Sequence, residues 1–326
     1  MFEIIKPTIN IDFVGKRKLW MWLSVLVIVG TGILFFTKGL NYGIDFTGGA
    51  EVQLKAPEGW DIGKLRGSLE AGGFESFKVQ QIGSAEERQF LVKAQGNEKD
   101  LNSTSAKVEE ALKKGGAAGG YEIQRVDVVG PAAGSSLRMS GFLSMLYALI
   151  CILVYVAIRF DARYAPGAVL ALFHDTVITV GIFILTQKQF DLQILAAILA
   201  LIGYSNNDTI IVFDRVRETI QNHPKMEIAA AVNRAINETL GRTFLTSFMT
   251  FLSVVSLWLF GGKVIEDFAF TLMVGLIVGT YSSVFIASSL VIYLTQWMDK
   301  NEAAAKVAGP NSKKKQIVTR PQPKLQ

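Results

Sequence analysis

Ionisable and hydrogen-bonding side chains lie inside two long apolar stretches of this sequence. His174 and Asp175 occur in one stretch, and Tyr204, Asn207 and Asp208 occur in the next. A carboxyl group surrounded by hydrocarbon has its ionised form disfavoured, so such a group can bind and release a proton near neutral pH. The residue types therefore indicate a proton relay inside a membrane.

Helical spacing predicts which of these groups meet. Tyr204, Asn207 and Asp208 share one face of a helix. The following apolar stretch opens with Arg242, and Thr246 lies one turn later on the same face. Because this stretch runs in the opposite direction, both residues should lie at the depth of Asp208. We expect Asp208 to contact Arg242 or Thr246 across two neighbouring spans.

Two structural alternatives remain open for these charges. Asp208 and Arg242 can form a static ion pair that joins two helices, or Arg242 can extend to the membrane surface. No zinc-type spacing, nucleophile–base motif or phosphate-binding glycine loop occurs, so neither protease nor ATPase chemistry is supported. We expect no cofactor besides protons as the coupling ion, and no metal. The single cysteine, Cys151, lies in an apolar stretch and provides no disulfide framework.

The elements that carry these groups are predicted to be membrane-spanning helices. Half of the 326 residues are hydrophobic, and they are gathered into runs of about 20 residues, the length that crosses a bilayer. The first run lacks a small-residue cleavage site and is read as an uncleaved anchor. The predicted spans are Leu19–Thr37, Met139–Ile158, Ala165–Thr186, Phe190–Phe213, Leu240–Phe260 and Phe268–Trp297.

Charge around the spans predicts their orientation. Lysine and arginine accumulate on the cytoplasmic side of membrane proteins, and here they cluster between spans two and three, between spans four and five, and after span six. Residues 1–18 and the basic, disordered tail 299–326 should therefore be cytoplasmic. The first span covers 19–38, the others fall within 139–298, and residues 39–138 lie outside. The net charge of +5 follows this topology, and we expect no specific nucleic-acid partner.

The external region has the pattern of a small α+β domain. Alternating segments and amphipathic helices follow the order β-α-β-β-α-β, which is ferredoxin-like. The segment before it places Asp45, Phe46, Gly48 and Gly49 immediately outside the membrane. The residues alone favour a tight turn here, in which glycines take backbone angles closed to other residues.

Two further patterns concern helix packing. Gly275, Gly279 and Ser283 form a stripe of small residues at steps of four on span six, which lets another helix approach closely. Between spans four and five, the apolar residues of 228–236 share one face. This face predicts a separate amphipathic helix on the cytoplasmic surface.

Several motifs together resemble the SecF family of the bacterial SecD–SecF protein-export complex. The resemblance covers nearly the whole chain except the tail. It rests on 43–49 (GIDFTGG), 163–168 with 174–175 (RYAPGA, HD), 203–209 with 213–215 (GYSNNDT, FDR), 242–247 (RTFLTS) and 279–283 (GTYSS).

The resemblance implies a six-helix half of an RND-like membrane core that pairs with SecD in the bacterial inner membrane. It implies that the proton-motive force assists preproteins that leave SecYEG, with YajC and YidC as further candidate partners beside the lipid bilayer. Asp208 would carry the proton, with Arg242 as its basic neighbour and Asp175 as a second acid. Asp45 and Phe46 would link the outer domain to the core. The alternative is an RND-type small-molecule or lipid transporter subunit.

Overall fold

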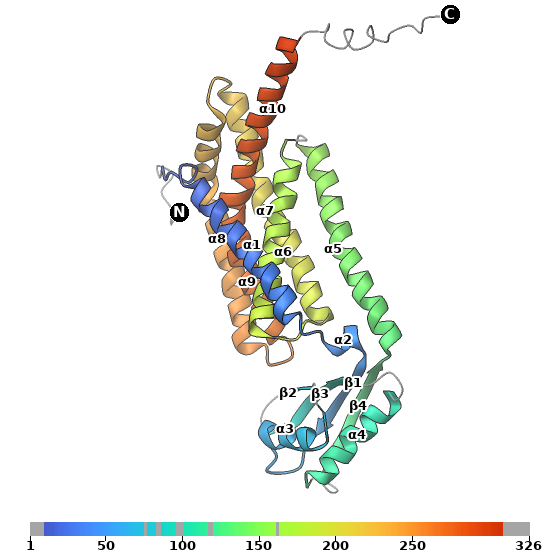
Figure 1. Ribbon diagram of the computed structural model, residues 1–326. Helices are drawn as coiled ribbons and strands as arrows, with labels where there is room; N and C mark the ends of the chain where they lie inside the picture. Colours follow the sequence, from blue (N-terminus) through green and yellow to red (C-terminus); the bar gives the residue numbers. More distant parts are fainter. Residues whose placement is uncertain are drawn as a thin grey trace, which may run out of the picture.

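The computed structural model describes residues 10–74, 77–82, 86–95, 101–116, 120–160 and 163–308. Within them are six helices long and apolar enough to cross a membrane, which confirms the predicted helical membrane fold. The spans form one bundle with a small domain at one end (Figure 1). They comprise α1 (Arg17–Lys38), α5 (Pro131–Arg159), α6 (Ala165–Thr186), α7 (Leu192–Asn222), α8 (Ile228–Phe260) and a sixth span formed by α9 (Glu266–Ser282), a π-helical turn (Ser283–Ala287) and α10 (Ser288–Ala308).

Helices α7 and α8 are longer than the bilayer requires. Helix α8 is continuous from Ile228, so the prediction of a separate amphipathic helix over 228–236 is wrong. The apolar face that suggested it is real, but Val232 and Ile236 pack against Phe213 of α7 and not against lipid. The asparagine Asn233 lies on the same stretch of α8, and its Oδ1 accepts the Phe13 N–H at 2.9 Å. The segment before α1 is thereby held across α8.

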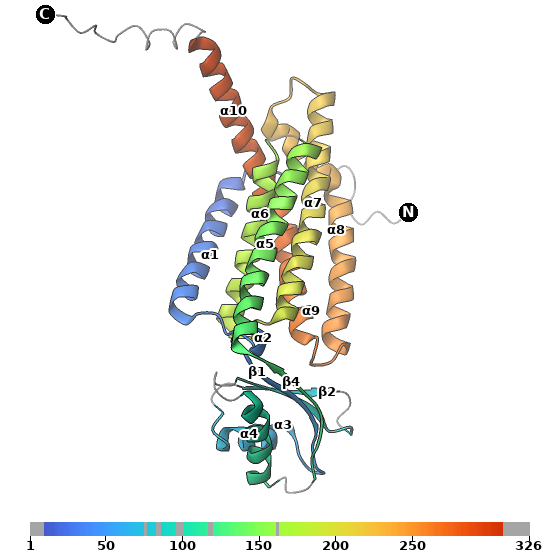
Figure 2. The same ribbon diagram turned by 90° about the vertical axis from the view of Figure 1, so that its right-hand side faces the viewer.

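The ends of other spans also differ from the expected bounds. Helix α5 begins at Pro131, eight residues before the apolar run starts at Met139, because proline is well tolerated in the first turn of a helix. Helix α10 continues to Ala308, so residues 299–308 are helical and not disordered; this stretch contains three consecutive alanines, which favour helix. Figure 2 shows α10 projecting beyond the bundle. The rest of the predicted tail, and residues 1–9, lie outside the described residues.

The external domain has the predicted β-α-β-β-α-β order. Strands β1 (Gly49–Lys55), β2 (Phe77–Ile82), β3 (Gln89–Gln95) and β4 (Glu122–Val129) alternate with α3 (Ile62–Ala71) and α4 (Leu101–Lys114). The sheet order is β2-β3-β1-β4, and every pairing is antiparallel. Strands β2 and β4 are therefore the two edges of the sheet.

One face of the sheet forms the core of the external domain. Val52 and Leu54 of β1 and Val92 of β3 are fully buried there, against Leu65 and Leu69 of α3. The sheet lies between these helices and the bundle in Figure 1. The opposite face of the sheet therefore meets the outer ends of the membrane helices.

A short helix joins the first span to the domain. Helix α2 (Ile44–Thr47) lies between α1 and β1. Its Phe46 stacks on Phe190 with ring centroids 6.0 Å apart, next to the start of α7. The chain leaving α1 is thus fixed to the α6–α7 connection before it enters the sheet.

Candidate proton-relay site

Asp208 lies in α7 with its side chain turned into the bundle. Only 1% of the residue is exposed, and its Oδ2 accepts a hydrogen bond from the Ser247 hydroxyl of α8 at 2.9 Å. Its other oxygen, Oδ1, is buried and has no hydrogen-bond partner among the described residues. Buried polar atoms are normally satisfied, so this oxygen is free to take a proton or to bind water.

The expected contact of Asp208 with Arg242 or Thr246 is not formed. Arg242 and Thr246 are exposed on α8, and the Thr246 hydroxyl donates to the Arg242 carbonyl at 3.0 Å. The face of α8 that meets α7 contains Thr243 and Ser247 instead, both buried. No ion pair joins Arg242 to Asp208 among the described residues. The partner of Asp208 thus lies on the expected helix, but on the face next to the one that carries Arg242 and Thr246.

The other polar groups of α7 point in different directions. The Tyr204 hydroxyl donates to Thr250 of α8 at 3.2 Å. Asn207 is exposed, although Asp208 beside it is buried. Successive residues of a helix are rotated by about 100°, and this rotation separates Asn207 from the buried face.

A second acid, Asp175, lies in α6 at the centre of a hydrogen-bond cluster. Its Oδ2 accepts from Ser205 of α7 at 2.6 Å and from Ser282 of α9 at 2.8 Å. Its Oδ1 lies 3.0 Å from His174 Nδ1. All of these groups are buried. Asp175 therefore joins three helices through one carboxyl group.

The cluster continues through His174 toward α1. His174 Nε2 lies 3.0 Å from the Ser24 hydroxyl, which lies 3.0 Å from the Tyr281 hydroxyl of α9. Tyr281 in turn donates to the Trp20 carbonyl at 3.1 Å. Each of these hydroxyl and imidazole groups can donate and accept a hydrogen bond. This row of hydrogen bonds could therefore carry a proton between Asp175 and α1.

The small residues of the sixth span lie where α9 meets α7. A Cβ atom on Gly275 would come within 2.3 Å of Leu201, and one on Gly279 within 2.9 Å of the Ser205 hydroxyl. Ser283 opens the π-helical turn, and its hydroxyl lies 3.0 Å from that of Thr209. Single π turns inside α-helices occur frequently at functional sites. The stripe brings α9 close enough for Ser282 to reach Asp175.

The junction segment 43–49 contacts the outer end of α7. Asp45 Oδ2 accepts the Leu192 N–H at 3.0 Å, and the N-cap residue Asp191 accepts the Ile194 N–H at 3.1 Å. Two carboxylates therefore meet the positive end of the helix that carries Asp208.

Lys93 of β3 completes this charged junction. Its ammonium lies 3.2 Å from Glu51 and 3.8 Å from Asp191. Burial alone would lower the pKa of Lys93, but the nearby carboxylates, Glu51 first, outweigh burial and raise this pKa. Burial raises the pKa of Asp191, which lies outside the span, and Lys93 offsets only part of that effect. The sheet is thus attached electrostatically to the start of α7.

The glycines of the segment 43–49 fit both predictions made for it, a tight turn and a junction between the outer domain and the spans. Gly48 has φ +83°, a conformation that favours glycine, and a Cβ there would come within 2.9 Å of the Pro131 nitrogen at the start of α5. A Cβ on Gly49 would lie 2.4 Å from the Ala94 carbonyl. The segment is a tight turn and also a close junction of helix and sheet.

Replacing Asp45 by Ala is expected to destabilise this junction by about 1 kcal/mol, the usual cost of losing a helix-capping carboxylate. The Leu192 N–H loses its acceptor, and thermal unfolding in detergent measures the effect. Asp45→Asn is the matched control, since it keeps an acceptor oxygen and should cost less. Equal losses for both variants would contradict a capping role.

Among the described residues, no group of three His, Cys, Asp or Glu side chains converges to hold a metal ion. The chemistry available in the bundle is that of carboxyl, imidazole and hydroxyl groups. No hydrogen bond joins Asp208 to the Asp175 cluster among the described residues, but Ser205 and Asp208 lie one turn apart on α7. The site therefore has two buried acids on neighbouring helices, Asp175 on α6 and Asp208 on α7, each with its own hydroxyl partners.

Comparison with known proteins defines the class of this molecule. The family described as protein export membrane protein SecD/SecF, C-terminal, matches residues 107–297. The SecD/SecF GG motif matches residues 33–56, which include Gly48 and Gly49. The chain is thus a SecD/SecF-type membrane protein with six candidate spans.

The relatives identify the family within this class. The protein translocase subunit SecF of Calditerrivibrio nitroreducens is 48% identical over 305 residues, 91% of this chain and 98% of the relative. That of Vibrio alginolyticus is 40% identical over 294 residues, 90% of this chain and 93% of the relative. The chain belongs to the SecF family.

A solved structure has the same fold. The crystal structure of SecDF, a translocon-associated membrane protein from Thermus thermophilus, superposes with a TM-score of 0.74 at 34% identity over 89% of this chain. The chain spans 39% of the length of that SecDF chain.

Several residues of the site were not predicted from the sequence. They are hydroxyl groups that meet the two acids or His174, directly or through one other group: Ser24, Ser205, Ser247, Ser282 and Tyr281. Their signal was weak, because serine and tyrosine are tolerated in many membrane helices. Ser205 lies within the polar segment 204–208, and its place three residues before Asp208 was the best available clue.

Proposed function

We propose that this chain uses the proton-motive force to assist preprotein export, as the SecF subunit of a Sec accessory complex. One observation carries the proposal: Asp208 is buried in a membrane helix with one carboxylate oxygen unpaired. A carboxyl group in this state can load and release a proton. Because the chain belongs to the SecF family, the process that this proton transfer would drive is preprotein export.

The exposed polar groups support a partner half. Asn207, Arg242 and Thr246 lie beside Asp208 but are exposed on the isolated chain. Polar side chains in a membrane normally face protein or a water-filled cavity. The solved SecDF chain is more than twice as long as this one. The part of it that has no counterpart here would cover the surface formed by Asn207, Arg242 and Thr246. We assign that role to SecD, with SecYEG, the moving preprotein, YajC and YidC as further partners.

The orientation follows from charge. Arg159 ends α5 and Arg163 lies between α5 and α6. Arg215 and Arg217 lie in the distal part of α7, at the end away from the sheet (Figure 1). By the positive-inside rule this end is cytoplasmic and the sheet domain lies on the opposite side. Because the chain belongs to the SecF family, we place it in the bacterial inner membrane with the sheet domain in the periplasm. The outer domain then lies on the periplasmic side of the membrane, where the proton concentration is higher.

Translocation into inverted membrane vesicles tests the proposal. Vesicles that contain the chain should complete late translocation faster when a proton gradient is imposed, and vesicles depleted of it should not respond. The control is ATP-driven early translocation, which should be equal in both. A gradient response of equal size after depletion would overturn the proposed function.

A further inference from the structure

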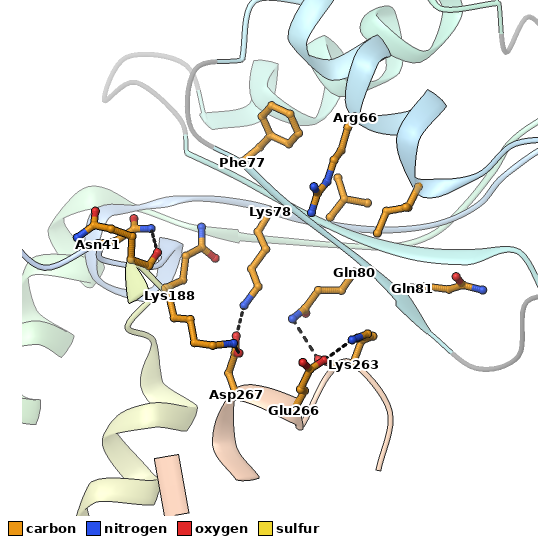
Figure 3. Close-up of a pocket in the computed structure, with 14 residues that line it drawn as sticks. Asn41, Arg66, Phe77, Lys78, Gln80, Gln81, Lys188, Lys263, Glu266 and Asp267 are labelled. Carbon is orange, nitrogen blue, oxygen red and sulfur yellow. Dashed lines mark hydrogen bonds and ion pairs between the residues drawn. The ribbon is translucent and has the colours of Figure 1, made fainter. Parts of the chain in front are cut away.

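The cavity between the sheet domain and the membrane bundle contains an open strand edge. Strand β2 is the last strand of the sheet and pairs only with β3 among the described strands. A cavity of about 560 Å³ lies along it, between the sheet and the connections before α7 and α9 (Figure 3). An unpaired edge presents a row of N–H and C=O groups that can pair with another chain.

The residues that line this cavity come from both sides of β2. Ile62 and Arg66 of α3 lie on the helix-covered side of the sheet, and Lys78 and Gln80 point from the opposite side toward the bundle (Figure 3). Because residues from both sides of β2 line the cavity, the cavity must pass along the outer edge of this strand. In the described part of the chain, no hydrogen bond from a side chain reaches the backbone of Phe77–Ile82, so the outer N–H and C=O groups of β2 are available.

The charges in the cavity are paired in part. Lys78 and Lys188 both bind Asp267, with Nζ to carboxylate distances of 2.5 and 2.6 Å. Lys263 binds Glu266 at 2.6 Å. These pairs join the sheet to the bundle, and with Arg66 the lining carries four cationic and two anionic side chains, so the cavity is net positive.

The remaining polar groups are mainly side-chain amides, including Asn41, Gln81, Gln187 and Gln189. Gln189 is 92% buried, and its Oε1 has no hydrogen-bond partner among the described residues. An unsatisfied buried acceptor in a native structure calls for a donor, and a peptide N–H is one. Amides bind peptide groups whatever the neighbouring side chains are.

The opposite edge of the sheet lacks these properties. Strand β4 is mostly exposed and has alternating charges, with Arg125 and Asp127 paired at 2.7 Å. Charged side chains of this kind discourage pairing of an edge strand with other chains. The two edges therefore differ: β4 carries charged side chains beside the exposed Val126 and Val128, whereas β2 opens into an amide-lined groove.

We infer that the β2 edge binds an extended, unfolded polypeptide by strand addition. Six residues of β2 can pair with a segment about 20 Å long through main-chain hydrogen bonds. Such binding depends little on sequence, as a site for many exported chains requires. The inference deepens the proposed export function and rests on it for the source of the polypeptide.

Photo-crosslinking tests the site directly. Benzoylphenylalanine is placed at Gln81 of the full chain, co-purified with its membrane partners in nanodiscs, without a proton gradient. The probe is reduced, carboxymethylated lactalbumin, which stays unfolded, and native lactalbumin is its folded counterpart. We expect position 81 to capture the unfolded probe several-fold more than the native one, and more than benzoylphenylalanine at Arg125 on the β4 edge does.

A second variant separates binding from folding. Gln189→Leu removes the unpaired oxygen and should lower crosslinking from position 81 without lowering the unfolding temperature. Equal capture at positions 81 and 125, or capture at 81 of a partner subunit or second copy instead of the probe, overturns the inference. Because no gradient is used, this result is independent of the gradient response that tests the proposed function.

Discussion

Asp208→Asn is expected to abolish the gradient-dependent part of export and to leave the level of the chain in the membrane unchanged. Asparagine has the same shape, and its Oδ1 can still accept the Ser247 hydrogen bond. It cannot bind or release a proton near neutral pH. Late translocation with an imposed gradient should therefore fall to the rate measured without one.

Two further variants make this result specific. Asp208→Glu keeps a carboxyl group and should retain part of the gradient response. Ser247→Ala removes the hydroxyl partner but leaves the acid, and should lower the response less than Asp208→Asn does. If Asp208→Asn instead lowers the unfolding temperature and the gradient response is kept, Asp208 is a structural group and the relay assignment is wrong.

Asp175→Ala is expected to destabilise the bundle by about 3 kcal/mol. The substitution removes the acceptor shared by Ser205, Ser282 and His174, and all three are buried. A buried hydrogen-bonding group that loses its partner costs about 1–3 kcal/mol, and three such groups lose their acceptor here. Thermal unfolding in detergent should show a clear decrease in midpoint.

Asp175→Asn is the matched control for this effect. Its amide keeps one acceptor oxygen, so it should lose less stability than Asp175→Ala. His174→Phe tests the branch toward α1, since it leaves the serine contacts intact and removes the link to Ser24. A wild-type midpoint for Asp175→Ala would show that the cluster is not needed for packing.

The fold was predictable because its signals are local. Six long apolar runs each form a span, and the alternation of the outer region matches its strand order. The positions of Asp175 and Asp208 inside the bundle followed from the same runs. These predictions needed no knowledge of which helix faces which.

The partners of the acids were not predictable, because they depend on helix rotation. Helix α8 has two adjacent polar faces, one with Arg242 and Thr246 and the other with Thr243 and Ser247. The sequence favours the face with Arg242 and Thr246 as the partner of Asp208, but that face is exposed on this chain. The face with Thr243 and Ser247 meets α7 instead. A similar ambiguity explains the wrong prediction of a separate surface helix over 228–236. The apolar face of this stretch suits a membrane surface as well as a neighbouring helix.

The capped start of α7 gives this helix the geometry of a lever. Asp45 fixes Leu192 to the segment that enters the sheet, and Asp208 lies 16 residues further along the same unbroken helix, about 24 Å at 1.5 Å per residue. A small tilt of α7 around Asp208 would therefore displace its outer end over a long arm. The sheet, attached at that end, would travel much further than the Asp208 carboxyl group at the pivot.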